Sequence, residues 1–71
     1  MNWDRVEGNW KRWGGKIKER WGELTDNDLA VINGRREMLV GRLQERYGKT
    51  QAELEREVEE LFAAEESYSE P

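Results

Sequence analysis

The charged side chains are the groups in this sequence that could do chemistry. Asp, Glu, Lys and Arg make up 39% of the 71 residues, and neither His nor Cys occurs. Zinc sites built on thiolates or imidazoles, and Ser/His/Asp or Cys/His catalysis, are therefore excluded. Carboxylates alone can form an acid–base pair or bind calcium. The dense carboxylates of residues 53–60 belong to a solvated helix face, so we expect no catalytic residue, no metal site and no cofactor.

A strip of arginines is the best candidate for binding an anion. Arg35, Arg42 and Arg46 are separated by seven and four residues, so they share one face of a helix. Guanidinium groups arranged in this way bind phosphates. The same strip can instead pair within the chain, with Glu37, Glu45 and the acidic last segment. We favour this intramolecular interpretation.

Four tryptophans between Trp3 and Trp21 form a second conspicuous feature. With basic residues interleaved, they could stack on nucleic-acid bases or sit among lipid headgroups. They share one helical face with Val6 and Ile17, however, which is typical of a stripe that faces a core. Partial exposure of Trp3 or Trp13 would then be the source of an aromatic contact. The candidate interaction surface comprises Lys11, Lys18, Arg35, Arg42, Arg46 and Trp13.

Helices must position these side chains, because there is no alternating β-branched segment and the one proline is the last residue. Apolar residues spaced by three and four predict a single first helix over about 2–24, with a possible bend at Gly14-Gly15. Thr25 predicts the start of a short second helix, and a third covers about 35–47. The capping box Thr50-Gln51-Ala52-Glu53 starts a fourth helix that runs to about 64. Gly14 and Gly41 predict the close approach of another backbone.

The composition permits a thin core and one domain. The expected domain covers 1–64, followed by a frayed acidic tail over 65–71. Residues 1–49 carry a net charge of +3 and residues 50–71 a net charge of −7, so the total of −4 conceals a polarity. The expected core consists of Val6, Trp10, Ile17, Trp21, Leu24, Leu29, Ile32, Leu39, Leu43, Tyr47, Leu54, Val58 and Leu61.

Three segments carry a family resemblance. They are WDRVEGNWK (3–11), GKIKERWGELTDNDL (15–29) and GRREMLVGRLQERYG (34–48). Together they resemble the CsbD-like family of small bacterial stress proteins, over roughly 2–60, whereas the tail beyond Phe62 departs from it. The resemblance implies an all-α bundle of about four helices, two helical hairpins packed at a steep angle, with a long acidic last helix partly extending from the body. It implies no reaction, cofactor or catalytic residue.

The expected function is that of a non-enzymatic stress protein with surface contacts to an unidentified protein partner. One alternative is a weak, salt-dependent nucleic-acid binder that uses the basic first and third helices. Another is reversible attachment to anionic membranes by an opened first helix, without stable membrane insertion. The polar start of the chain lacks an export signal, so the cytoplasm is the expected location. The sequence predicts no particular oligomeric state.

Overall fold

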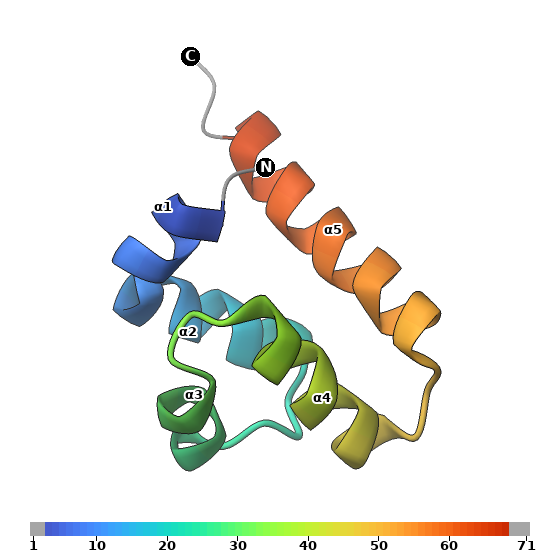
Figure 1. Cartoon of the computed structure of the whole chain (residues 1–71). Helices are drawn as coiled ribbons and strands as arrows, with labels where there is room; N and C mark the ends of the chain where they lie inside the picture. The colour runs from blue at the N-terminus through green and yellow to red at the C-terminus, as the bar shows by residue number, and fades with distance from the viewer. Residues whose placement is uncertain (1–2, 69–71) are drawn as a thin grey trace.

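The described part of the chain folds entirely into α-helices and connecting turns (Figure 1). The computed structural model describes residues 3–68, with side chains described over 3–64. The helices are α1 (Trp3–Gly8), α2 (Trp10–Arg20), α3 (Asp26–Ile32), α4 (Arg36–Tyr47) and α5 (Gln51–Tyr68). This confirms the expected all-α class and the expected small bundle.

Two threonines start helices, as their sequence context predicts. The Thr25 hydroxyl accepts a hydrogen bond from the Asp28 amide at 3.1 Å, and the Asp28 carboxylate accepts one from the Thr25 amide at 2.9 Å. At α5, the Thr50 hydroxyl accepts from the Glu53 amide at 3.2 Å. Both threonines thereby satisfy amides that the first helical turn leaves without partners.

The prediction of one helix over 2–24 is wrong, because the helix breaks at Asn9. Asn9 has φ −118° and ψ 30°, outside the helical range, and its side-chain amide donates to the Arg5 carbonyl at 3.0 Å. Asparagine competes for backbone groups in this way, and the neighbouring Gly8 is a weak helix former. α2 instead continues without interruption through Gly14-Gly15, so the glycine pair does not break the helix.

The two predicted close backbone approaches are also absent. A Cβ atom added at Gly14 would meet the Leu29 side chain at 3.6 Å, an ordinary side-chain contact. A Cβ atom added at Gly41 would meet nothing within 4 Å, so no described segment of the chain crosses α4 there. The close approach occurs at a third glycine, Gly34, where an added Cβ atom would lie 2.8 Å from the Glu7 Cα.

The core contains most of the apolar stripe residues and two that were not expected. Trp10, Tyr47 and Leu61 are half-buried and pack against it. Val40 and Phe62 are buried although neither was included in the expected core. The buried residues from the expected core are Val6, Ile17, Trp21, Leu24, Leu29, Ile32, Leu39, Leu43, Leu54 and Val58.

α4 and α5 together organise the bundle. α4 packs against both α3 and α5. The rings of Trp3 and Trp13 lie 4.9 Å and 4.3 Å from the Phe62 ring, so α1 and α2 reach the far end of α5 (Figure 1). α5 extends to Tyr68, past the expected end at 64, and the last part of the predicted tail, 69–71, lies outside the described residues.

Gly34 supplies a test of how α1 is attached. Its φ of +82° strains any other residue, and an added Cβ would collide with the Glu7 backbone. We expect Gly34→Ala to lower the free energy of unfolding by about 1–3 kcal/mol in urea melts. Gly48→Ala is the control, because Gly48 also has a positive φ, +66°, but nothing within 4 Å of its added Cβ. Equal losses in the two variants would contradict the contact with Glu7.

Candidate interaction surface

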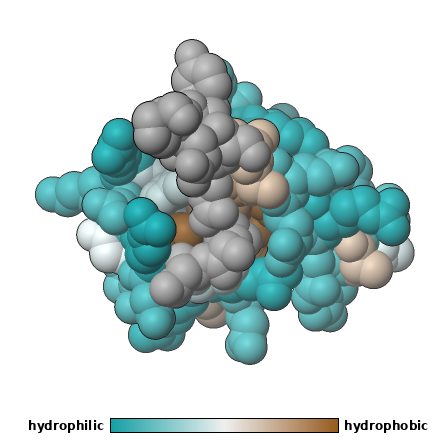
Figure 2. All heavy atoms as spheres, turned by 90° about the horizontal axis from the view of Figure 1, so that it is seen from above, coloured by the Kyte–Doolittle hydropathy of each residue, from teal (hydrophilic) through white to brown (hydrophobic). Residues whose placement is uncertain are grey.

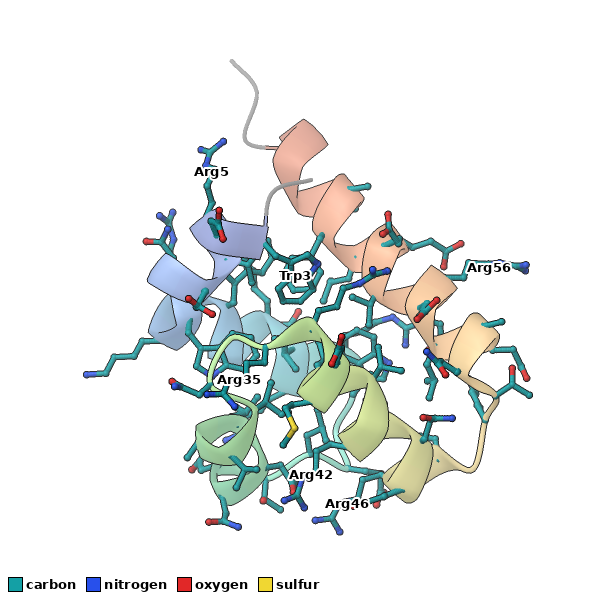
Figure 3. The ribbon with its side chains drawn as sticks, in the orientation of Figure 1. Trp3, Arg5, Arg35, Arg42, Arg46 and Arg56 are labelled. Carbon is teal, nitrogen blue, oxygen red and sulfur yellow. The ribbon has the colours of Figure 1, made fainter. Side chains whose placement is uncertain are left out.

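A buried carboxylate lies against two of the three arginines of the predicted strip. Asp28 is fully buried, and its Oδ1 atom accepts from Arg46 at 3.0 Å and from Arg42 at 3.4 Å. The hydrogen bond from the Thr25 amide, followed by that from Arg46, holds the pKa of Asp28 below its usual value of 3.8. Arg42 and Arg46, which Figure 3 shows side by side, thus join α4 to the start of α3.

The other candidate residues fall into two groups. Lys18 pairs with Asp26 at 2.7 Å on the surface, and Trp13 is half-buried against Phe62. Lys11 and Arg35 are exposed and make no ion pair with a described carboxylate. The structure therefore does not gather the six candidates into one site.

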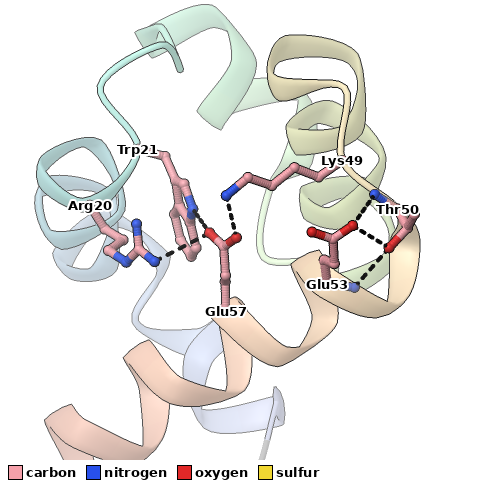
Figure 4. A network of polar contacts seen from close by, with 6 residues as sticks. All are labelled: Arg20, Trp21, Lys49, Thr50, Glu53 and Glu57. Atoms are coloured by element: carbon pink, nitrogen blue, oxygen red, sulfur yellow. Dashed lines mark hydrogen bonds and ion pairs between the residues drawn. The ribbon is translucent and has the colours of Figure 1, made fainter.

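Glu57 forms a second polar centre, which was not among the candidate residues (Figure 4). Its carboxylate accepts from Lys49 at 2.6 Å, from the Trp21 indole at 3.1 Å and from Arg20 at 3.2 Å. The hydrogen bond from Lys49, followed by that from Trp21, lowers the pKa of Glu57 from its usual 4.5. Glu57 thereby connects α5 to the end of α2 and to the loop before α5. The available signal was its spacing, since it follows Leu54 by three residues and shares that inward face.

These two carboxylates predict how stability depends on pH. Both pKa values are lower in the folded chain than in the unfolded chain, so the stabilisation is fully present above the ordinary values of 3.8 and 4.5. It is lost as the pH falls through the lowered, folded values. We expect urea midpoints to be level from about pH 7 to about pH 5 and to fall below that.

The pH prediction has a matched pair of variants. Glu57→Gln should lose stability near neutral pH and show a weaker acid dependence, because the titrating group is gone. Glu60→Gln, on the exposed side of α5, should retain the acid dependence of the parent protein. The same acid dependence in both variants would contradict a role for Glu57.

Four exposed cations come from α1, the first turn of α2 and the turn before α4, and we refer to them as the basic end. They are Arg5, Lys11, Arg12 and Arg35, and none makes an ion pair with a carboxylate among the described residues. The contact of Gly34 with Glu7 brings the turn that carries Arg35 next to α1. Arg5 and Arg35 lie on one side in Figure 3, and Arg56 points outward from α5 on the other.

A shallow groove of about 450 Å³ runs between α4 and α5, and we refer to it as the α4–α5 groove. The residues lining it include Arg36, Glu37, Gly41 and Gln44 from α4, and Gln51 and Glu55 from α5. Arg36 pairs with Glu59 at 3.0 Å, whereas Glu37 and Glu55 make no ion pair with a described cation. The groove therefore presents two uncompensated carboxylates.

The described surface is rich in charged side chains. Among the residues searched, no three His, Cys, Asp or Glu side chains are grouped so that they could hold a metal ion. None of the described helices is both long enough and apolar enough to cross a membrane. The face seen in Figure 2 is mostly hydrophilic, with small apolar areas between the charged side chains. This arrangement suits contacts with charged partners.

Comparisons with known proteins agree on one family. A family model described as CsbD-like matches residues 4–56. The chain is 59% identical over 58 residues to the UPF0337 protein ECA0631 of Pectobacterium atrosepticum, which covers 82% of this chain and 84% of that protein. The UPF0337 protein YjbJ of Escherichia coli K12 is 53% identical over 58 residues, with 82% and 84% covered.

A third relative has a similar degree of identity. The UPF0337 protein RPA4217 of Rhodopseudomonas palustris is 55% identical over 62 residues, which cover 87% of this chain and 94% of that protein. None of these three names states a reaction, a ligand or a partner. No solved structure matches the chain.

Proposed function

Since this chain belongs to the CsbD-like family, we propose that it is a non-enzymatic stress protein that acts through contacts between its charged surface and a protein partner. The observation that carries this proposal is the separation of uncompensated charge. Among the described residues, four of the exposed cations without an ion pair belong to the basic end, and two of the carboxylates without an ion pair line the α4–α5 groove. Separated surfaces of opposite sign steer and orient a charged partner.

The contacts of the arginine strip weigh against nucleic acid as that partner. Arg42 and Arg46 direct guanidinium hydrogen bonds to Asp28, and Lys18 pairs with Asp26. A polyanion would have to compete with these carboxylates for the strip. The four cations of the basic end are a small electrostatic footprint beside a net charge of −4.

The contacts of the tryptophans weigh against attachment to a membrane by an opened first helix. The Trp10 indole donates to the Leu29 carbonyl at 2.8 Å, and Trp21 is buried and bonded to Glu57. Trp13 packs on Phe62. Turning these rings toward lipid would remove them from the core that holds the helices together.

The proposal is tested by affinity capture from stressed cells with the whole chain and two charge-reversal variants. Lys11→Glu/Arg12→Glu reverses part of the basic end, and Glu37→Lys/Glu55→Lys reverses the carboxylates of the groove. We expect a specific protein to be captured by the parent chain and lost with one of the two variants. Removal of α5 is not a suitable variant, because it would take Leu54, Val58 and Phe62 out of the core.

Two outcomes would contradict the proposed function. One is a set of captured proteins that both charge-reversal variants retain in full, since the charged surfaces would then play no part. The other is turnover of a substrate by the purified chain that a single side-chain substitution abolishes. Treating the captured material with nuclease separates a protein partner from one held through nucleic acid.

A further inference from the structure

Gly41 is a glycine that the fold of this chain does not require. It lies inside α4, where glycine destabilises a helix relative to alanine. Its φ is not positive, and an added Cβ would meet nothing within 4 Å. A Cβ atom could therefore be added at Gly41 without a clash with any described residue. Because Gly41 has no side chain, this part of the α4–α5 groove is open to the close approach of another backbone.

The groove around Gly41 is short of positive charge. Glu37 and Glu55 line it and make no ion pair with a described cation, and Glu55 accepts only an amide hydrogen bond from Gln51, at 3.0 Å. The guanidinium of Arg36 is directed to Glu59. A guest that brings a backbone to Gly41 and a cation to the two carboxylates would match both features.

At the basic end, the first turn of α2 lacks carboxylates. Lys11 and Arg12 lie in the first turn of α2, which contains no acidic residue, and its N-cap Asn9 makes no side-chain capping bond. Cations in a first turn oppose the helix dipole, and carboxylates are favoured there. The placement of these two cations is unfavourable in the isolated chain and becomes favourable when carboxylates from outside approach them.

We propose that the α4–α5 groove of one copy of this chain receives the basic end of a second copy, through Lys11 and Arg12 against Glu37 and Glu55. The two surfaces are different, so the contact is head-to-tail, and a pair of copies retains one free groove and one free basic end. Further copies can therefore add to the pair, and association grows with concentration. The inference deepens the proposed function, because it names the protein partner as a second copy of the chain.

The first test is sedimentation velocity of the intact chain over a range of concentrations. At about 0.01 M salt, where the Debye length is about 30 Å, the sedimentation coefficient should rise with concentration. At about 1 M salt, where the Debye length is about 3 Å, it should remain that of a monomer. A monomer at every concentration in low salt would overturn the proposal.

The second test fills the groove without weakening the fold. Gly41→Gln places a polar side chain that favours helix on the floor of the groove, so the variant should melt at a higher temperature than the parent. It should nevertheless weaken self-association by about tenfold or more. Gly15→Gln is the matched control, since Gly15 is also inside a helix, exposed and free of neighbours within 4 Å. Unchanged association of the Gly41 variant would overturn the proposal.

The third test exchanges the charges between two copies. Lys11→Glu/Arg12→Glu chains and Glu37→Lys/Glu55→Lys chains should each remain monomeric at low salt, because like charges then face each other. Mixing them should restore association, as a reversed basic end meets a reversed groove. Failure of the mixture to associate would overturn the head-to-tail pairing. Capture of another protein that depends on the same charges would still leave the proposed function standing.

Discussion

Replacing Trp21 with alanine is expected to lower the free energy of unfolding by about 3–5 kcal/mol, a large share of the about 5–15 kcal/mol that holds a typical domain together. The indole is 2% exposed and is among the largest fully buried side chains of the described core. Its loss would leave a cavity between α2 and α5 and remove one donor from Glu57. Urea melts followed by circular dichroism measure the effect.

Trp21→Phe separates the two contributions of this residue. The variant keeps an aromatic ring in the core but has no N–H group to donate to Glu57. We expect a smaller loss, about 1–3 kcal/mol. A loss in Trp21→Ala no larger than in Trp21→Phe would contradict the placement of the whole ring in the core.

Phe62→Ala is expected to cost about 3–5 kcal/mol, whereas Leu61→Ala should cost about 1 kcal/mol. Phe62 is fully buried and receives the rings of Trp3 and Trp13, while Leu61 is half-buried at the edge of the core. The neighbouring position is thus a matched control for the same helix. Urea melts measure the free energy of unfolding of both variants. Equal losses in Phe62→Ala and Leu61→Ala would indicate that α5 is rotated about its axis relative to the packing described.

The helix starts could be predicted because their causes are local. Thr25 and Thr50 each accept from the amide three residues further on, and the partner of each lies within the same capping box. The apolar stripe likewise has a local periodicity, and most of its members are buried. Such features depend on neighbours in sequence, which the sequence displays directly.

The break at Asn9 could not be predicted from periodicity. The apolar spacing runs on past Asn9 without a change of phase, so it favours one helix. The break allows Val6 to reach the core and Trp3 to reach Phe62 at the other end of the chain. That gain comes from tertiary packing, which overrides local propensity.

The candidate surface was predicted less well, because the partners of charged residues are set by the fold. The spacing of Arg42 and Arg46 placed them correctly on one face, and the favoured interpretation was pairing within the chain. Their shared partner is Asp28, a residue of the preceding helix that was not among the predicted partners, and Arg42 also pairs with the predicted partner Glu45 at 3.8 Å. Glu57 was one carboxylate among many, and only the placement of Lys49 and Trp21 distinguishes it.

The packing of the helices has a consequence for how the chain folds. α4 packs on its sequence neighbours α3 and α5, so these contacts close only short loops. We expect α3, α4 and α5 to assemble first, on the microsecond to millisecond scale of helical proteins with local contacts. The contacts of Trp3 and Trp13 with Phe62 join the two ends of the chain and form last. Phe62→Ala would then speed unfolding and leave the folding rate almost unchanged.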